Sequence, residues 1–326
     1  MQHGVHKVFL VTGGAGFIGS HVCDALLAAG AQVRCIDNLA TGKESNIAHL
    51  RPRNDFRFIQ ADICNAADLN AAVKGVDAVV HLAALGSVPR SIEHPLESEQ
   101  ANLAGFLQVL EAMRAEGVKR IVYASSSSVY GDSVQLPKRE GTEGAALSPY
   151  AVTKDMDEAY AALYVRLFGI EAIGLRFFNI FGERQDPEGA YAAAIPKFIR
   201  ALLKGEAPVL NGDGLQTRDF TYVANAVKAV RSALDAPAQR AGEVYNIACG
   251  ESCDLRSLLG KLQHRLARVV PQAAGIKPVH GPDRPGDVRA SLADISKARE
   301  QLDYSPCYTL DEGLDRAVPW YAEHWG

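Results

Sequence analysis

The chain has 326 residues, of which 48% are hydrophobic and 22% are charged, and its formal net charge is −4. This length predicts one large domain or two interlocked domains around a substantial core. The weak negative charge excludes a broad positive field, so neither nucleic acid nor an anionic membrane is expected as a partner. No apolar run is long enough to span a membrane, and the polar N-terminus does not resemble a signal peptide. We therefore expect a cytoplasmic protein.

The six cysteines are scattered along the chain, at Cys23, Cys35, Cys64, Cys249, Cys253 and Cys307. No histidine-rich segment accompanies the two that lie closest together, so a zinc pattern is not completed. We expect mostly buried thiols that behave as small hydrophobic side chains, and we predict no metal site.

The first half of the chain alternates strand-like and helix-like segments. Strands are expected at Lys7–Val11, Gln32–Ile36, Phe56–Ile59, Asp77–Leu82 and Lys119–Ala124, and helices at Phe17–Ala29 and Pro95–Glu116. Strands that alternate with helices of ten or more residues are typical of βαβ units and a parallel sheet. Right-handed crossovers then give an α/β fold with a Rossmann-like, doubly wound parallel sheet.

After Arg176, prolines and glycines divide the chain into short segments, with a helix expected at Tyr222–Leu234 and a strand at Glu243–Ala248. We expect that helix and strand to return to the first domain. Residues 1–176 with about 219–248 would then form the cofactor-binding Rossmann domain. Residues 177–218 with about 249–326 would form a smaller C-terminal substrate lobe.

A glycine-rich turn, residues 12–19 (TGGAGFIG), joins the first strand to the first helix. Such a turn lets the backbone approach a pyrophosphate and directs the helix N-terminus at the anion. Gly13 would make the tight turn, Gly16 the close approach and Gly19 the packing of helix on strand. The spacing is one residue longer than the common dinucleotide fingerprint, and an ordinary βα turn is the alternative.

Asp37 ends the second strand, where a carboxylate can accept hydrogen bonds from the ribose hydroxyls of a dinucleotide. A carboxylate there repels a 2′-phosphate, so NAD is favoured over NADP. The alternative is that Asp37 only begins the turn that follows it. Asp62 and the segment Leu82-Ala83-Ala84 are expected to line the adenine and its ribose.

Tyr150 and Lys154 are four residues apart after Ser148-Pro149, a typical helix start, and therefore share one helix face. A tyrosine has an ordinary pKa of ~10, and a neighbouring ammonium together with a nicotinamide cation favours the phenolate that a general base requires. By themselves the two residues could equally be a packed phenol and a solvated amine. Four serines, residues 125–128, follow an apolar strand, where hydroxyls at the carboxyl end can hold a substrate.

The motifs in this order resemble the extended short-chain dehydrogenase/reductase family, and most closely its 4-epimerases of UDP-N-acetylhexosamines or their uronic acids. The resemblance runs from about Lys7 to Trp320. Besides the motifs above, it rests on residues 84–91 (ALGSVPRS), 126–132, 148–150, 176–179 (RFFN), 211–214 (NGDG), 218–220 (RDF) and 284–288 (RPGDV).

The resemblance implies that Tyr150 is the acid/base, that Lys154 orients the cofactor and the phenol, and that Ser126 bridges the reacting hydroxyl. The residues implied to hold NAD are Gly13, Gly16, Phe17, Ile18, Gly19, Asp37, Asn38, Asp62, Ile63, Leu82, Ala83, Ala84, Asn102, Tyr150, Lys154 and Phe177. The residues implied to bind the UDP-sugar are Ser87, Ser126, Ser127, Ser128, Asn179, Phe198, Asn211, Arg218, Arg284, Asp287 and Ser291. Phe177 stands where many relatives have tyrosine, which leaves its role in doubt.

The implied reaction oxidises C4 of the hexose to a ketone, turns the sugar, and reduces it on the opposite face. NAD is regenerated in each cycle and is expected to stay tightly bound. Ser291 is small where relatives that exclude acetamido sugars have a bulky residue. We therefore expect UDP-GlcNAc and UDP-GalNAc, or the corresponding uronic acids, as substrates, with weaker activity on UDP-glucose and UDP-galactose.

Three other functions remain open. A nucleotide-sugar 4,6-dehydratase or decarboxylase is one, although dehydratases usually have Asp-Glu where this chain has Ser127 and Ser128. A non-catalytic NAD-binding protein is another, although such relatives would be expected to lose Tyr150 or Lys154. An alcohol dehydrogenase that releases NADH is the third. A homodimer through the helices Pro95–Glu116 and Pro149–Phe168 is expected by analogy with the family.

Overall fold

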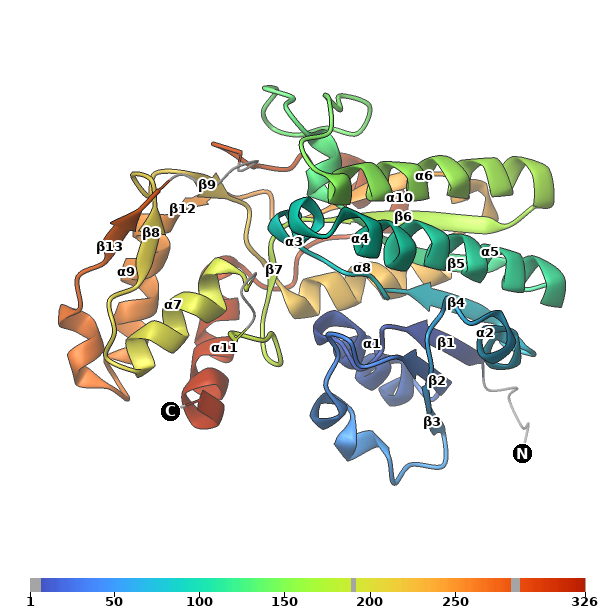
Figure 1. Cartoon of the computed structure of the whole chain (residues 1–326), viewed down its shortest axis with the longest axis horizontal. Helices are drawn as coiled ribbons and strands as arrows, with labels where there is room; N and C mark the ends of the chain where they lie inside the picture. The colour runs from blue at the N-terminus through green and yellow to red at the C-terminus, as the bar shows by residue number, and fades with distance from the viewer. Residues whose placement is uncertain (1–6, 189–191, 283–287, 326) are drawn as a thin grey trace.

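The computed structural model describes residues 7–188, 192–282 and 288–325. Its centre is a seven-stranded sheet in which all neighbouring strands are parallel (Figure 1). The strands are β1 (Val8–Thr12), β2 (Gln32–Asp37), β3 (Phe56–Gln60), β4 (Ala78–His81), β5 (Arg120–Ser126), β6 (Glu171–Phe177) and β11 (Val244–Ile247). Most are short apolar runs, as expected for strands that are covered on both faces.

The strand order is β3-β2-β1-β4-β5-β6-β11, and helices cover both faces of the sheet. One face carries α1 (Phe17–Ala28), α8 (Val223–Asp235) and α10 (Ser296–Leu302); the other carries α2 (Ala66–Val73), α5 (Gly105–Glu116) and α6 (Pro149–Phe168). This arrangement confirms the expected Rossmann-like fold. The strand order reverses between β1 and β4, and ligands of such sheets bind at the carboxyl ends of the strands beside this point.

The helix expected at Pro95–Glu116 is present, but its hydrogen-bond pattern changes partway. It begins as α4 (Pro95–Glu99), continues through a π-helical turn at Gln100–Ala104, and ends as α5 at Gly117, which has a φ of 73°. A shorter helix, α3 (Val88–Glu93), precedes it. A π-helical turn widens the helix locally and often occurs at a functional site. Here it contains Asn102, one of the residues expected to serve the site.

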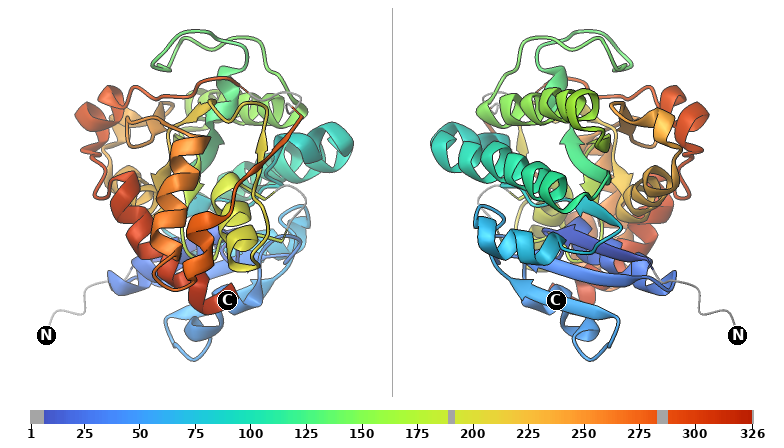
Figure 2. Two further views of the ribbon diagram at one scale, coloured as in Figure 1. Left: turned by 90° about the vertical axis from the view of Figure 1, so that its left-hand side faces the viewer. Right: turned by 90° about the vertical axis from the view of Figure 1, so that its right-hand side faces the viewer.

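The smaller lobe lies beyond the carboxyl ends of the strands and has its own apolar core (Figures 1 and 2). Its helices are α7 (Ala194–Leu203), α9 (Leu255–Leu266) and α11 (Leu310–Trp325). Its short strands pair as β7 (Ile180–Phe181) with β10 (Thr221–Tyr222), β8 (Val209–Asn211) with β13 (Val279–Gly281), and β9 (Thr217–Arg218) with β12 (Cys253–Asp254).

The chain passes between the two parts more than once. β11 pairs with β6 in the central sheet, and α10, from the segment expected in the lobe, contacts β11 and α8. The division of the chain between the two parts stays a prediction. In the ranges that the structure describes, no helix combines the length and apolarity needed to cross a membrane.

Candidate active site

The turn between β1 and α1 has room for backbone only. Gly13 has a φ of 68°, and a Cβ there would lie 2.7 Å from the backbone nitrogen of Ala83. A Cβ on Gly19 would overlap the carbonyl oxygen of Gly13. Gly16 is the N-cap of α1 and has no side chain to occupy the first N–H groups of the helix. The turn therefore brings backbone and a helix N-terminus to the crevice without side chains, as a bound diphosphate requires.

Gly19→Ala is expected to lower the NAD content of the purified protein by about tenfold or more. The added methyl must push the helix away from the turn, and overpacking of this kind typically costs about 1–3 kcal/mol. NAD content is measured by denaturing the protein and assaying the released nucleotide. Gly260→Ala is the matched control, because a Cβ there meets nothing within 4 Å. Full NAD retention in Gly19→Ala would contradict this role of the turn.

Asp37, the last residue of β2, lies beside the glycine-rich turn. Its carboxylate is buried and accepts hydrogen bonds from the backbone N–H groups of Ala15 and Leu39, at 3.0 and 2.8 Å. Burial raises its pKa and outweighs the opposite effect of these hydrogen bonds. A buried acceptor held by the turn itself fits a ligand hydroxyl group. The bond from Leu39 belongs to the turn that Asp37 begins, and the bond from Ala15 links the carboxylate to the glycine-rich turn as well.

A cavity of 410 Å³ lies between the glycine turn and the carboxyl ends of the strands. Nine of the residues expected to hold NAD line it: Gly13, Gly16, Asp37, Asn38, Asp62, Ile63, Leu82, Ala83 and Ala84. The long helix adds Gln100 and Ala101 from its π-helical turn, which the sequence did not indicate. A glycine cradle that a Cβ would fill, small alanines and a buried carboxylate together fit a dinucleotide. We call this space the first cavity.

The other expected NAD residues lie outside the lining of the first cavity: Phe17, Ile18, Gly19, Asn102, Tyr150, Lys154 and Phe177. Asn102 is fully buried, and its side chain accepts from the N–H of Leu85 at 2.7 Å and donates to Thr153 Oγ1 at 3.2 Å. It therefore links the long helix both to the segment after β4 and to α6. Phe17 and Ile18 begin α1 and pack against the lobe core.

The first turn of α6 presents Tyr150 and Lys154. The side chain of Ser148 caps the helix by accepting from the N–H of Ala151 at 3.1 Å, and Pro149 takes the first helical position. Both features stabilise a helix start. Tyr150 is half-buried, whereas Lys154 is almost fully buried with its Nζ 3.0 Å from the carbonyl oxygen of Ala124. Tyr150 therefore remains accessible at the start of the helix, whereas the ammonium of Lys154 is fixed between α6 and strand β5.

Lys154 Nζ also lies 3.1 Å from Oδ2 of Asp157. Burial acts to lower the pKa of Lys154, but the charges of Asp157 and Tyr150 act in the opposite direction and the net pKa is raised. Lys154 is therefore an ammonium at neutral pH.

Two of the four serines, Ser125 and Ser126, end strand β5, and the other two begin the helical turn that follows it. Ser125 Oγ donates to Glu158 on α6, away from the crevice. Ser126 Oγ accepts from the N–H of Ser128 at 3.1 Å and lies 3.0 Å from Ser128 Oγ. Because successive residues of a strand point to opposite faces, Ser125 and Ser126 face different sides of the sheet, and Ser126 is the one that faces the substrate side.

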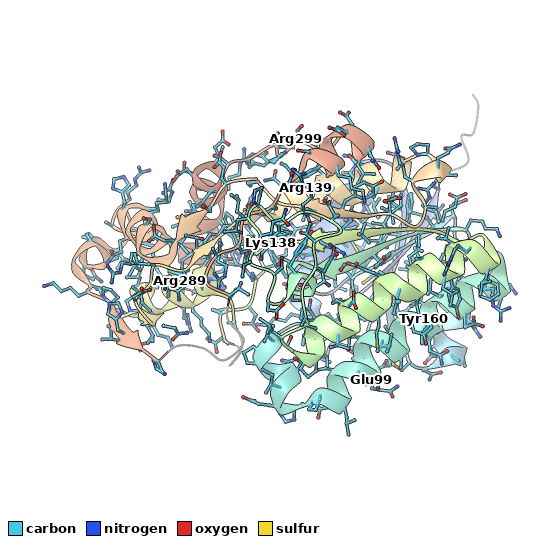
Figure 3. The ribbon with its side chains drawn as sticks, turned by 90° about the horizontal axis from the view of Figure 1, so that it is seen from above. Glu99, Lys138, Arg139, Tyr160, Arg289 and Arg299 are labelled. Carbon is cyan, nitrogen blue, oxygen red and sulfur yellow. The ribbon has the colours of Figure 1, made fainter. Side chains whose placement is uncertain are left out.

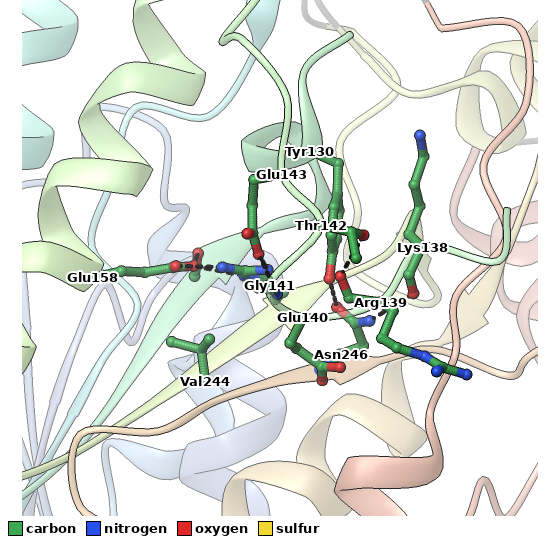
Figure 4. Close-up of polar contacts among 12 residues, drawn as sticks. Tyr130, Lys138, Arg139, Glu140, Gly141, Thr142, Glu143, Glu158, Val244 and Asn246 are labelled. Carbon is green, nitrogen blue, oxygen red and sulfur yellow. Dashed lines mark hydrogen bonds and ion pairs between the residues drawn. The ribbon is translucent and has the colours of Figure 1, made fainter. Parts of the chain in front are cut away.

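Behind this loop, ion pairs and hydrogen bonds fix the segment that follows the serines (Figure 4). Glu143 and Glu158 both pair with Arg176 of β6. The hydroxyl of Tyr130 donates to Asn246 Oδ1 at 2.7 Å. These contacts tie residues 130–143 to the sheet and so hold one wall of the site in place.

A second cavity, of 310 Å³, lies between the sheet and the lobe. Nine of the expected catalytic, cofactor or substrate residues line it: Ser87, Ser126, Ser127, Ser128, Tyr150, Phe177, Asn179, Arg218 and Ser291. They come from segments as far apart as the loop after β4 and the chain after the lobe strand β13. The fold therefore gathers the phenol, the serines and a guanidinium around one space.

Four expected substrate residues are placed differently. Phe198 is buried in the lobe core on α7, and Asn211 is on β8; neither lines the second cavity. Arg284 and Asp287 lie outside the described residues.

The second cavity also contains residues that sequence reasoning missed, among them Tyr130, Lys138 and Leu147. Lys138 lies between the lobe and the sheet (Figure 3). Its N–H donates to Leu292 O at 2.7 Å and its carbonyl oxygen accepts from the N–H of Asp294 at 2.8 Å. The Leu-Pro-Lys sequence after the serine loop was a possible signal, but only this long-range pairing shows that the lysine reaches the cavity.

Known proteins resemble this chain in both sequence and structure. Residues 9–248 match the NAD dependent epimerase/dehydratase family. The chain belongs to this family. A UDP-glucose 4-epimerase of Mycolicibacterium smegmatis is 36% identical, covering 96% of this chain and 97% of that protein. A UDP-N-acetyl-alpha-D-glucosaminuronate decarboxylase of Bacillus cytotoxicus is 31% identical, covering 97% and 98%.

Two solved structures are similarly close. A UDP-N-acetylglucosamine 4-epimerase from Methanobrevibacter ruminantium M1, in complex with UDP-N-acetylmuramic acid, has a TM-score of 0.91 and 37% identity and covers 98% of this chain and 99% of that one. A UDP-glucuronic acid 4-epimerase from Bacillus cereus, with UDP-glucuronic acid and NAD, has a TM-score of 0.88 and 33% identity and covers 97% and 99%. The resemblance to the extended short-chain dehydrogenase/reductase family is thus confirmed, as is NAD as its cofactor. The protein is an enzyme, an isomerase of the 4-epimerase type.

Proposed function

We propose that this enzyme interconverts UDP-GlcNAc and UDP-GalNAc, or the corresponding uronic acids, through a 4-keto intermediate. The observation that carries the proposal is the second cavity, where Tyr150 and Ser126 line one space and the buried ammonium of Lys154 lies behind the phenol. A UDP-sugar 4-epimerase needs one acid/base at the reacting hydroxyl and room for the sugar to turn. A cavity between the sheet and the lobe supplies both.

In this proposal Tyr150, as phenolate, takes the proton of the C4 hydroxyl, and Ser126 positions that hydroxyl by a hydrogen bond. Lys154 favours the phenolate by its charge. The glycine turn and Asp37 would hold NAD, which would supply a reversible hydride acceptor for C4. Arg218 and Asn179 lie where a diphosphate can be gripped, so that the nucleotide stays fixed while the sugar turns.

Two features of the second cavity bear on the sugar. Ser291 is buried in its wall and is small, which leaves space for an acetamido group. Lys138 and Arg218 are the positively charged residues among the described lining, and that lining contains no aspartate or glutamate. This charge suits a diphosphate and tolerates a carboxylate at C6. Both the neutral and the acidic acetamido sugars are therefore proposed as substrates.

The test is to incubate the purified enzyme separately with UDP-GlcNAc, UDP-GalNAc, their uronic acids and UDP-glucose, and to read the C4 configuration by proton NMR. We expect the acetamido sugars to approach an equilibrium mixture of C4 epimers and UDP-glucose to react more slowly. If none of the five sugars changes at C4, the proposed function is wrong.

The decarboxylase among the relatives makes loss of CO₂ or water the second candidate reaction. Loss of water from a 4-keto sugar needs a further acid and base beside the serine loop, to remove the C5 proton and protonate the departing C6 hydroxyl. At that place the structure has Ser127 and Ser128, which line the second cavity and cannot serve as carboxylic acids. The same NMR spectra distinguish the reactions, because a product that lacks C6 or an oxygen at C6 would favour this candidate.

We also propose that the enzyme is a homodimer through the neighbouring helices α3, α4 and α6, which contact one another. Their outer sides expose apolar side chains: Ile92, Leu96, Val152 and Met156, with Leu96 81% exposed. A group of exposed apolar residues on adjacent helices is typical of a protein interface.

The double variant Val152→Asp/Met156→Asp is expected to elute as a monomer in size-exclusion chromatography with light scattering. Val269→Asp, on an exposed residue of the lobe, should leave the dimer intact. A monomeric unmodified enzyme would contradict the proposal.

A further inference from the structure

Asp157 is a buried carboxylate that the reaction as proposed does not use. It lies on α6, one turn after Lys154, and both side chains are almost completely buried, at 0% and 2% exposure. Its Oδ2 is 3.1 Å from Lys154 Nζ, whereas its Oδ1 is buried and has no hydrogen-bond partner in the described part of the chain. The carboxylate therefore makes its one polar contact with the lysine behind the catalytic phenol.

The groups around Asp157 leave Lys154 as its charge partner. Glu158, the next residue, pairs with Arg176 of β6. His81 of β4 is buried, and burial, helped by the charge of Lys154, lowers its pKa to about 3, so it is neutral at physiological pH. Tyr123 of β5 has a pKa well above the usual value, because it is buried and faces the charges of Glu158 and Asp157. It is therefore neutral as well.

Burial disfavours the charged form of Lys154, and the negative charge of Asp157 counteracts this effect of burial. A lysine removed from water loses its proton more readily unless an anion lies close by. Among the influences on Lys154, burial lowers the pKa most, and the charge of Asp157 is the largest of those that raise it. Burial also raises the pKa of Asp157 to about 6, since the lysine offsets only part of the cost. Above that pH the two groups form an ion pair directly behind Tyr150.

We propose that Asp157 is a positioning residue of the epimerisation, whose carboxylate keeps Lys154 protonated and directed at the region behind Tyr150. The proposal rests on the proposed function, because it assigns Asp157 to the acid/base step of that reaction. It acts through Lys154 and has no contact with the substrate cavity, whose described lining does not include it. Without the carboxylate, the largest of the influences that oppose burial is lost, so the pKa of Lys154 falls and the phenolate form of Tyr150 loses part of its support.

The test compares Asp157→Asn, which keeps the shape of the side chain, with the unmodified enzyme. We expect kcat near neutral pH to fall by about tenfold, the change that one unit of pKa represents. The pH range of activity should also narrow from both sides: the alkaline limb moves down because Lys154 loses its proton earlier, and the acidic limb moves up because less Tyr150 is phenolate. Asp157→Glu should restore part of both limbs. Asp155→Asn, on the exposed side of the same helix, is the control and should change neither.

Two readouts need no turnover. The phenolate content of Tyr150 is measured as the ultraviolet tyrosinate absorbance that Tyr150→Phe lacks, and it should be lower in Asp157→Asn at each pH. The NAD content of the variants reports whether Lys154 still serves the cofactor. If activity falls while both limbs and the phenolate content stay unchanged, the role of Asp157 is merely structural and the proposal is wrong. If the enzyme epimerises no UDP-sugar but the phenolate content shifts, the proposed function fails and the link between Asp157, Lys154 and Tyr150 holds.

The pH dependence of stability gives an independent check. The folded pKa of Asp157, about 6, is higher than its unfolded value, so the folded state binds its proton more tightly. The stability that this provides is complete below the unfolded pKa and is lost as the pH rises through about 6. Asp157→Asn lacks this loss. Its melting temperature should therefore rise relative to that of the unmodified enzyme between about pH 4 and pH 6 and then level off. A difference that is constant across this window would mean that Asp157 does not titrate as inferred.

Discussion

Tyr150→Phe is expected to lower kcat for epimerisation by roughly 10³-fold while leaving NAD and the UDP-sugar bound. The substitution removes one oxygen atom from a half-buried side chain at the wall of the second cavity, and no described hydrogen bond depends on that atom for the fold. The ring and the helix start at Ser148 remain. Only the group that takes and returns the proton is lost, so the effect should fall on kcat and not on binding.

The measurement is the steady-state rate of C4 epimerisation, together with the NAD content and the binding of UDP by calorimetry. Tyr160→Phe, on the same helix (Figure 3), is the matched control and should keep its activity. A Tyr150→Phe enzyme with near-normal kcat would show that another group is the acid/base. Loss of NAD together with activity would instead point to a collapsed site.

Ser291→Tyr is expected to lower kcat/KM for UDP-GlcNAc and UDP-GalNAc by roughly 100-fold, with little change for UDP-glucose and UDP-galactose. Ser291 is 5% exposed, and its backbone is held in the wall of the cavity by a hydrogen bond from its N–H to Thr217 O at 3.1 Å. A phenol at this position has no space except the cavity. Overpacking against the acetamido group typically costs about 1–3 kcal/mol, and the upper end of this range corresponds to a change of roughly 100-fold in rate.

Initial rates with the four sugars give the ratio of acetamido to unsubstituted activity for each enzyme. Ser296→Tyr, at an exposed position at the start of α10, controls for the chemistry of the substitution. If Ser291→Tyr slows all four sugars equally, Ser291 does not set the choice of sugar at C2. If it slows none of them, residue 291 does not face the sugar.

The sheet was predictable because its strands are short apolar runs between clear turn signals. The expected strand Glu243–Ala248, for example, is β11 (Val244–Ile247), and the expected helix Tyr222–Leu234 is α8 (Val223–Asp235). The π-helical turn at Gln100–Ala104 was not predictable, since helical periodicity tolerates one changed hydrogen bond. The turn contains Asn102, which forms hydrogen bonds with Leu85 and Thr153. These partners are distant in the sequence, so the position of the turn is set only in the folded chain.

The site residues also fall into a group that was predictable from the sequence and a group that was not. Residues next to a strand end or at the start of a helix, such as Gly13, Asp37 and Tyr150, were predictable because the local structure fixes where they point. Lys138 was missed because its place depends on a pairing with residues 292–294, far along the chain. Asp157 was missed because it reads as one more charge on an amphipathic helix. Its burial becomes evident only when β5 and β6 pack beneath α6.

The most direct test of the mechanism follows one hydrogen atom. UDP-GlcNAc carrying deuterium at C4 is incubated with the enzyme in ordinary water, and the UDP-GalNAc formed is examined by NMR and mass spectrometry. If Tyr150 removes only the hydroxyl proton and the carbon-bound hydrogen returns to the same carbon, the deuterium remains at C4 of the product. Replacement of the deuterium by solvent hydrogen would show that C4 exchanges with water, and it would contradict oxidation and reduction on a trapped coenzyme.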